Sequence, residues 1–244
     1  MILVYRLIPG YPLVLAANRD EFLDRGFSHP HLWPNDASRP RIFAGRDERL
    51  GGTWFGVNQH GIISGIVNRY TGHKDPTKRS RGHIVLDCLL HGSLQAAERF
   101  LENEDLSRYN PFTLFLYDRG GARIITNHQT RRSYRLREGI HVMTNCDPDD
   151  DTDPKKNHVR AMLGTVPHDP EKLRDTLVSV CMDHGGPQDF PFPVCVHLEG
   201  YGTVSSCILM VGERPDASRV HFCEGPPCKG TYVDLTHTLL SLSS

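Results

Sequence analysis

The 244-residue sequence lacks long apolar runs and an excess of charge of either sign. No stretch approaches the roughly 20 consecutive apolar residues of a membrane-spanning helix, so we expect no membrane span. Lys and Arg number 28 against 29 Asp and Glu, which leaves a formal net charge of -1. A nucleic-acid-binding surface usually shows a basic excess, so nucleic acid is not an expected partner.

Signals for secretion, for a disulfide framework and for a zinc motif are missing as well. The N-terminus has no basic lead, and Arg6 interrupts its apolar run too early for a signal peptide. The seven cysteines are odd in number and scattered from Cys88 to Cys228. No His-Glu-x-x-His or paired Cys-x-x-Cys motif occurs, and Cys223 and Cys228 miss the usual zinc spacing. We therefore expect a cytoplasmic protein without a metal site.

Short β-type runs separated by turn residues dominate the chain. They predict four hairpins, formed by residues 2–8 with 13–17, 53–58 with 62–67, 112–119 with 122–128, and 133–137 with 140–144. Further strands are expected at residues 194–198, 206–211, 220–223 and 232–235.

Three stretches carry the start and stop signals of helices. They are residues 83–100 with a break at Gly92-Ser93, residues 154–163 after an Asp153 cap, and a helix that opens at Asp169-Pro170 and stops at Gly185. Several strands are almost continuously apolar, which is typical of strands buried on both faces. The pattern predicts a layered α/β sandwich, and the absence of a linker or repeat predicts a single domain over residues 1–244.

The strongest local candidate for a site is Asn18-Arg19-Asp20-Glu21, which follows the apolar residues 13–17. An Arg fixed beside a carboxylate at a strand end can orient and polarise a reacting group, and it stays charged at any working pH. The alternative is a charged turn with a surface ion pair of small energetic value.

Other candidates have equally ordinary alternatives. Trp54, in a glycine-rich segment, is more often a core residue than a ligand contact. Asn68 and Asn145 each follow an apolar strand, where an amide can donate to a developing oxyanion or simply form a turn. Arg79 and Arg81 precede a predicted helix, where they can hold a phosphate or carboxylate or lie in an exposed loop.

Five motifs occur in one order along the chain. They are LAANRDEF at residues 15–22, GGTWFG at 51–56, SRG at 80–82, MTN at 143–145 and GYGTVSS at 200–206. Together they resemble the NRDE family, the transport-and-Golgi-organisation proteins, across nearly the whole chain. The resemblance implies an N-terminal-nucleophile (Ntn) hydrolase-like fold of class α+β. That fold is a four-layer αββα sandwich with two mostly antiparallel sheets between helical layers.

The wider pattern resembles the choloylglycine and penicillin V acylase branch of that superfamily. The resemblance implies that an ancestral catalytic site lies at Arg19, Asp20, Asn68 and Asn145. It further implies a cleft in which the ligand is contacted by three more residues, Asn18, Trp54 and Arg81.

Two departures from the family pattern bear on catalysis. Relatives typically begin Met-Cys, and the thiol exposed by Met removal attacks an amide with its own α-amine as base. Here Met1 is followed by Ile2, and the first cysteine is Cys88. Val204 also replaces the Arg that the family usually has in its Gly-Thr-Arg motif. The two departures favour a retained fold with altered or absent hydrolysis, that is, a pseudo-enzyme.

The resemblance therefore leads to a ligand-binding or ligand-trafficking function, with haem or an acyl-coenzyme A or lipid-type molecule as the ligand. No cysteine directly precedes a proline, and no haem-ligating residue can be chosen among the fourteen histidines. One alternative is a hydrolase of non-peptide C–N bonds whose N-terminal Cys comes from a different start or processing. Another is a secretory-pathway interaction protein without a saturable ligand.

Overall fold

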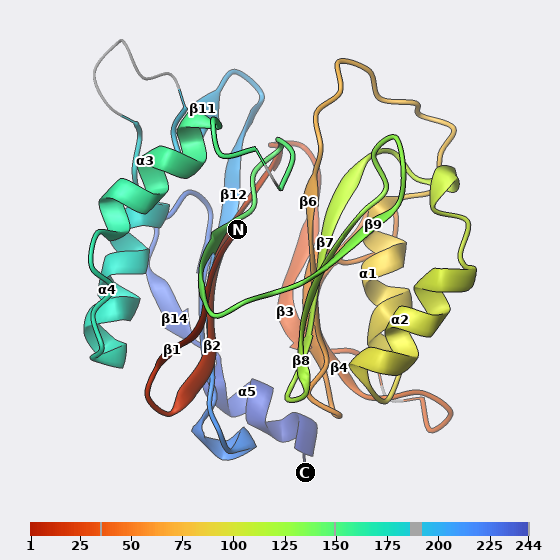
Figure 1. Cartoon of the computed structure of the whole chain (residues 1–244), viewed down its shortest axis with the longest axis horizontal. Helices are drawn as coiled ribbons and strands as arrows, with labels where there is room; N and C mark the ends of the chain where they lie inside the picture. The colour runs from red at the N-terminus through yellow and green to blue at the C-terminus, as the bar shows by residue number, and fades with distance from the viewer. Residues whose placement is uncertain (35, 149, 186–191, 244) are drawn as a thin grey trace. The chain divides into compact units, whose positions relative to one another are not determined.

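The computed structural model describes residues 1–34, 36–148, 150–185 and 192–243 (Figure 1). The chain folds into two compact units. Unit 1 contains Met1–Arg25, Arg137–Thr144 and Pro148–Leu240, and unit 2 contains Gly26–Leu136, Asn145–Asp147 and Ser241–Ser244. The single domain over residues 1–244 stays a prediction.

Unit 1 is built on an antiparallel sheet in the order β10-β1-β2-β12-β13-β14, with β11 paired to β12. Its strands are β1 (Ile2–Ile8), β2 (Tyr11–Phe22), β10 (Gly139–Val142), β11 (His197–Leu198), β12 (Tyr201–Val211), β13 (Arg219–Glu224) and β14 (Tyr232–Asp234). Helices α3 (Pro154–Leu163) and α4 (Pro170–Cys181) cover one face, where Leu173 and Leu177 pack on Val14 and Ile208 (Figure 1). The short helices η2 (Pro215–Ala217) and α5 (Thr236–Leu240) follow β12 and β14.

Unit 2 is built on a second antiparallel sheet, in which the strands β3 to β9 lie side by side in sequence order. The strands are β3 (Phe27–Leu32), β4 (Ile42–Asp47), β5 (Phe55–Asn58), β6 (Ile63–Asn68), β7 (Phe112–Asp118), β8 (Gly121–Thr126) and β9 (Arg132–Arg135). Helices α1 (Arg81–Leu89) and α2 (Leu94–Asn103) cover one face, with Ile84 and Leu101 packed among Leu114 and Leu116 (Figure 1). Two 3-10 turns complete the unit, η1 (Leu106–Arg108) and η3 (Ser241–Ser243).

Several of the sequence signals for burial and for helix ends are confirmed. Strand β7 is buried from Phe112 to Tyr117, and β12 is buried over residues 202–210, as expected for strands covered on both faces. Ser93 caps α2 by accepting a hydrogen bond from the backbone of Ala96. Asp153 caps α3, and Gly164 ends it.

Several predicted strand boundaries and pairings are wrong. Strand β2 continues to Phe22, so residues 18–21 lie inside a strand and not in a turn. The fourth hairpin does not form, because β9 pairs with β8 in unit 2 whereas β10 pairs with β1 in unit 1. Of the strand expected at residues 194–198, only His197–Leu198 forms.

The helices and edge strands also differ from the prediction. Helix α4 ends at Cys181 and therefore stops before Gly185. Strands β3 and β4 and helix α5 were not predicted. Pro30 lies within β3, which is tolerated because β3 is an edge strand with one unpaired side. Helix α5 has five residues, too few to show a periodic pattern.

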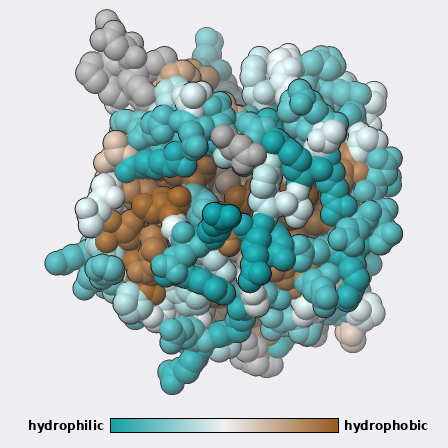
Figure 2. Space-filling model, in the orientation of Figure 1, coloured by the Kyte–Doolittle hydropathy of each residue, from teal (hydrophilic) through white to brown (hydrophobic). Residues whose placement is uncertain are grey.

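The side of the molecule in view in Figure 2 is mostly hydrophilic, with hydrophobic side chains gathered in a few places. Among the described residues, no helix combines the length and the hydrophobicity needed to cross a bilayer.

Candidate functional site

The central strand pair of unit 1 changes from apolar to polar along its length. Strand β2 pairs with β12 through Ala17↔Cys207, and the next three residues of β2 and their partners are polar. We call these residues the polar seam: Asn18, Arg19 and Asp20 on β2 with Thr203, Ser205 and Ser206 on β12. The register shifts between Thr203 and Ser205, so that Val204 forms a bulge, and the pairing continues beyond it from Thr203↔Asp20 to Tyr201↔Phe22.

Alternation along β2 places the seam residues on two faces of the sheet. Asn18 faces α4, because its Nδ2 donates to the carbonyl of Cys181 at 2.9 Å and to that of Val194 at 3.0 Å. Asp20 shares this face and Arg19 lies on the other one. The Arg19 side chain is buried, with 8% of the residue exposed, so the alternative of a solvated charged turn is wrong. The neighbouring ion pair joins Glu21 and Arg25 at 3.2 Å, with both side chains mostly buried.

The carboxylate of Asp20 is held by its partner on β12. Thr203 Oγ1 donates to Asp20 Oδ1 at 2.6 Å, and the backbone N–H of Val196 donates to Thr203 Oγ1 at 2.9 Å. The chain from Val196 through Thr203 to Asp20 fixes the position of the carboxylate, since each oxygen in it has a defined donor.

The α-amine of Met1 lies within the electrostatic range of the Asp20 carboxylate. It donates to the carbonyl of Met143 at 2.9 Å. Burial lowers its pKa from 8.0 to about 6, with Lys155 acting in the same direction and Asp20 opposing it. In a chain that starts at Met1, this amine is therefore mostly neutral at pH 7.

In the amide of Asn18, the nitrogen is hydrogen-bonded and the oxygen is not, within the described part of the chain. Both Nδ2 hydrogens bind carbonyls, which fixes the orientation of the amide. Its Oδ1 is buried and accepts no hydrogen bond from the described residues. A buried acceptor without a donor costs about 1–3 kcal/mol, so this position favours a bound group that carries an N–H or O–H.

No activated nucleophile accompanies the seam among the described residues of this face. Burial raises the pKa of the Cys181 thiol. Tyr232 OH and Ser206 Oγ lie 2.7 Å apart in a hydrogen bond, and burial raises the pKa of this Tyr far above its ordinary value. The face therefore offers hydrogen-bonding groups that can bind and orient a ligand.

The predicted pair Asn68 and Asn145 meets in unit 2. Asn145 Nδ2 donates to the carbonyl of Asn68 at 2.7 Å, and the carbonyl of Asn145 accepts from the backbone of Tyr70 at 3.1 Å. Both asparagines are exposed. Their amides follow the ends of strands, as the sequence indicated, and their role in a site stays a prediction.

Trp54 packs against its own sheet. Its ring meets Phe27 edge-on at 5.6 Å between centroids, and a Cβ at Gly45 would lie 2.5 Å from the indole. Gly45 is thus the residue that makes room for the ring. This geometry describes a packing role, while contact with a ligand stays a prediction.

The basic loop before α1 is tied to the protein itself. Arg81, the first residue of α1, donates to the carbonyl of Pro111 at 3.0 Å. Arg79 forms ion pairs with Asp87 at 2.9 Å and Glu104 at 3.6 Å. These contacts give no support to the phosphate site expected at this helix N-terminus, because the guanidinium groups already have anionic or carbonyl partners.

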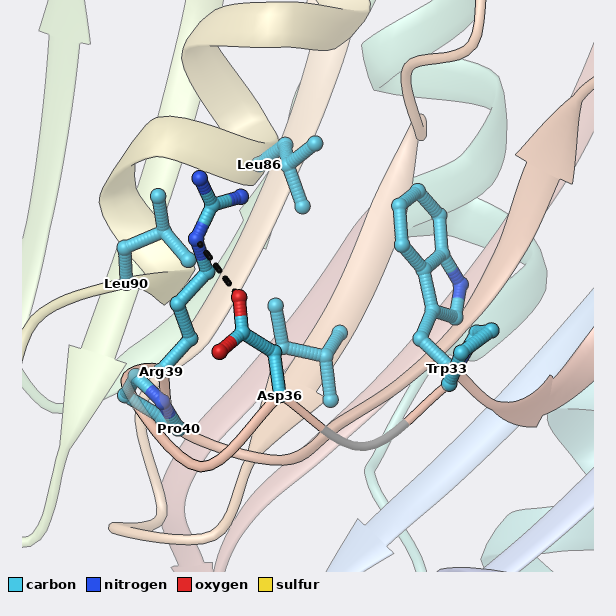
Figure 3. A pocket seen from close by; sticks show the side chains of 8 residues that line it. Trp33, Asp36, Arg39, Pro40, Leu86 and Leu90 are labelled. Carbon is cyan, nitrogen blue, oxygen red and sulfur yellow. Dashed lines mark ion pairs between the residues drawn. The ribbon is translucent and has the colours of Figure 1, made fainter.

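A cavity of about 230 Å³ lies in unit 2 beside α1, and the motifs gave no signal for it (Figure 3). Trp33, Leu86 and Leu90 form its apolar wall, and Asp36 and Arg39 point toward each other as an exposed ion pair at 3.4 Å. None of the residues predicted for the site lines it. An apolar wall with one solvated ion pair supplies no catalytic group.

Comparison with known sequences identifies relatives over most of the chain. Residues 1–225 match the family described as Transport and Golgi organisation 2. The human Transport and Golgi organization protein 2 homolog is 27% identical over 234 residues, which is 83% of each chain. The mouse Transport and Golgi organization 2 homolog is 35% identical over 79 residues, 31% of this chain and 28% of that protein. The Drosophila melanogaster protein is 32% identical over 124 residues, 46% of this chain and 42% of its own length. The chain thus aligns with less than half the length of two of these three relatives.

Two solved structures with the same fold are named as an acid amidase ortholog and as a conjugated bile acid hydrolase. The Caenorhabditis elegans ortholog of N-acylethanolamine-hydrolyzing acid amidase has a TM-score of 0.56 at 12% identity, over 86% of this chain and 91% of that one. A mutant of the conjugated bile acid hydrolase from Clostridium perfringens has a TM-score of 0.58 at 10% identity, over 100% and 94%. At such identities the likeness shows the fold alone. It confirms the predicted α+β class of Ntn-hydrolase type.

Proposed function

The chain belongs to the Transport and Golgi organisation 2 family, which is the NRDE family that its motifs resemble, and we propose a function from this premise. We propose that the chain binds and carries a small amphipathic ligand at the polar seam of unit 1. The ligand class is haem or an acyl-coenzyme A or lipid-type molecule. The observation that carries the proposal is the Asn18 Oδ1, a buried acceptor without a donor among the described residues, on the same face as Asp20, with the buried Arg19 on the opposite face of the strand.

The seam supplies what a polar head group needs. Arg19 is a permanent cation within the sheet, and a guanidinium binds carboxylate or phosphate oxygens through two parallel hydrogen bonds. Haem carries propionates, and acyl-coenzyme A carries phosphates and a thioester carbonyl. Both ligand classes therefore present an anionic group that suits an arginine.

The same end of the β2–β12 pair supplies apolar surface. Phe22, Leu23 and Leu198 are 54%, 61% and 65% exposed. Leu23 donates its N–H to the carbonyl of Gly200, and Phe22 packs edge-on against Tyr201, so the group is held in place. Exposed apolar side chains gathered beside polar groups are typical of surfaces that bind an amphipathic molecule.

The nearby Cys181 is not an activated nucleophile, because burial raises the pKa of its thiol. The proposal therefore assigns binding, and not cleavage, to the groups of the seam. A cytoplasmic location is part of this proposal, and a fluorescent fusion examined in cells of the source organism would test it.

The test is a titration of the purified chain with haemin and with palmitoyl-coenzyme A, followed by absorbance and by calorimetry. Arg19→Gln should weaken binding about ten- to hundredfold, because a hydrogen bond to a charged group contributes about 1.5–3 kcal/mol. Arg214→Gln is the matched control, since Arg214 belongs to unit 1 and its side chain is 78% exposed. Arg19→Lys keeps the positive charge and removes only the planar guanidinium group. It therefore shows whether the charge or the two parallel hydrogen bonds of the guanidinium bind the ligand.

Three results would contradict the proposal: saturable binding of neither ligand, equal affinity in Arg19→Gln and wild type, or equal weakening in the Arg214 control. Absence of any saturable ligand would favour the interaction-protein alternative.

Amide hydrolysis is the second candidate, because one structural neighbour is named as an acid amidase. It requires a mature chain that begins with Cys. Intact mass and N-terminal sequencing of the native protein decide this point, together with turnover of a panel of N-acyl amides. A retained Met1 without turnover removes this candidate.

A further inference from the structure

Four potential metal ligands from three segments of unit 1 converge on one point. They are His184, Cys195, His197 and Cys228, and their ligand atoms all lie within 4.8 Å of one another. Cys195 Sγ is 3.6 Å from Cys228 Sγ and 3.5 Å from His197 Nε2, and His197 Nε2 is 3.2 Å from Cys228 Sγ. The ring of His184 stands edge-on to that of His197, with 5.1 Å between the centroids.

These distances match the edges of a zinc tetrahedron. With Zn–S bonds of about 2.3 Å and Zn–N bonds of about 2.0 Å, tetrahedral geometry places two sulfurs about 3.8 Å apart and a sulfur and a nitrogen about 3.5 Å apart. The three measured separations lie within a few tenths of an ångström of these values. A Cys₂His₂ donor set is the composition of many structural zinc sites.

The backbone holds two of the ligands side by side. The carbonyl of Asp183 accepts from the N–H of Val194 at 3.1 Å and from that of Cys195 at 2.7 Å. This closure brings His184 next to Cys195. Val196 is paired with Thr203 on β12, so the alternation of an extended segment directs Cys195 and His197 to one side.

The fourth ligand comes from the turn between β13 and β14. Lys229 and Gly230 donate their N–H groups to the carbonyl of Pro226, which forms a tight turn around Cys228. A Cβ at Gly230 would lie 2.5 Å from Cys223 Sγ, so glycine is needed for the turn to pack on β13. The position of Cys228 is therefore set by local structure.

A bound divalent cation favours the thiolate form of both cysteines, because a coordinated thiol loses its proton. A disulfide between the two cysteines is the competing arrangement. It would draw the sulfurs from 3.6 Å to about 2.05 Å and leave both imidazoles without a role.

We propose that His184, Cys195, His197 and Cys228 bind one Zn²⁺ in a closed structural site. The ion joins residues 195–197 to the β13–β14 turn across the end of β12. Because Val196 lies between two ligands and donates to Thr203, which in turn donates to Asp20, the ion also stabilises the polar seam. This inference is independent of the proposed ligand and of any catalytic activity.

The test begins with the untagged full chain, purified under reducing conditions and equilibrated with Zn²⁺. We expect about one zinc per chain by mass spectrometry of the elements. Replacement by Co²⁺ should give the intense visible bands of tetrahedral cobalt and a thiolate-to-cobalt band in the near ultraviolet. A chelator should lower the melting temperature by about 5–10 °C. This is the shift expected when a ligand is removed whose free concentration was about a hundredfold above its Kd.

Matched variants assign the ligands. Cys228→Ser and His197→Asn should weaken Zn²⁺ binding more than about a hundredfold, since even neighbours of metal ligands contribute ten- to hundredfold. Cys146→Ser and His168→Asn should bind as the wild type does, because both residues are exposed and lie outside the cluster.

Three outcomes overturn the site. They are a reduced wild-type chain without the thiolate-to-cobalt band, a Cys195–Cys228 disulfide in the metal-equilibrated protein, and equal loss of zinc in the control variants. If a ligand variant fails to fold, the cobalt spectrum and the chelator shift of the wild type still decide.

Discussion

In each of the two units, one asparagine links a covering helix to the sheet through hydrogen bonds. The two asparagines differ in whether their Oδ1 atom accepts a hydrogen bond from the described residues. In unit 2, Asn58 Nδ2 donates to the carbonyls of Leu89 at 2.7 Å and His91 at 2.8 Å, at the end of α1. In unit 1, Asn18 Nδ2 donates to the carbonyl of Cys181, the last residue of α4, and to that of Val194. The two amides are therefore equivalent on their donor side.

The acceptor sides differ. Asn58 Oδ1 accepts from the backbone of His60 and of Ile62, each at 3.0 Å, so all of its polar atoms are used. Asn18 Oδ1 has no donor among the described residues. A saturated amide serves the fold alone, whereas an amide with an available buried acceptor serves the fold and can also bind a ligand. The comparison separates a structural residue from a candidate site residue of the same type.

The largest effect is expected at Asn58. Asn58→Ala removes four hydrogen bonds at a residue that is 1% exposed, and it should lower the free energy of unfolding by about 3–4 kcal/mol. Urea denaturation measures this change. Asn58→Asp is the companion variant, because it keeps the acceptor and loses both donors. A loss below about 1 kcal/mol would show that the tie to α1 is not needed.

A smaller loss of stability is expected at Asn18. Asn18→Ala removes two hydrogen bonds and leaves two carbonyls of unit 1 without their donor, so the free energy of unfolding should fall by about 2 kcal/mol. The same urea experiment checks the value. If Asn18→Ala lowers the free energy of unfolding as much as Asn58→Ala does, the two hydrogen bonds accepted by Asn58 Oδ1 do not contribute to stability.

A third effect concerns the amine of Met1 in a chain that starts there. Its pKa is lowered from 8.0 to about 6 in the folded state, so the amine binds more protons in the unfolded chain than in the folded chain between pH 6 and 8. The free energy of unfolding should therefore rise by at most about 2 kcal/mol between pH 6 and pH 8, and it should be lower below pH 6 than at pH 8.

The control for this pH effect is the N-acetylated chain, which lacks the titrating amine. Burial also lowers the pKa of His221 and His91, so both forms of the chain share the part of the slope that histidines cause. Identical slopes in the two forms would contradict the predicted effect of the buried amine.

The smallest effect is expected for the exposed pair of unit 2. Asn145→Ala removes one hydrogen bond to the carbonyl of Asn68, which water can replace, so the change should be about 0.5 kcal/mol or less. A thermal melt detects a larger value. A loss of about 2 kcal/mol or more would mean that this pair contributes to the fold as Asn58 does.

Features set by neighbouring residues could be predicted from the sequence. The Ser93 and Asp153 caps and the Gly164 stop need only a few consecutive residues, and the structure has each of them. The family motifs led to the fold class in the same way, because they are continuous in the chain. Local chemistry is visible in a single sequence.

Features that depend on distant partners could not be predicted. Residues 133–144 look like a hairpin, yet β9 and β10 have better partners in two different sheets. Asn18 to Asp20 look like a turn because their partners on β12 are far away in the sequence, at residues 203–206. The His184 cluster escaped the search for motifs, since its ligands come from three segments without a short common spacing.

The most direct test of the account compares ligand affinity in the two asparagine variants. Haemin and palmitoyl-coenzyme A are titrated into Asn18→Ala and Asn58→Ala under conditions where both remain folded. The account predicts that Asn18→Ala binds about tenfold more weakly than wild type and that Asn58→Ala binds equally well. Equal affinities in all three proteins, or equal weakening in both variants, would contradict a ligand site at the seam.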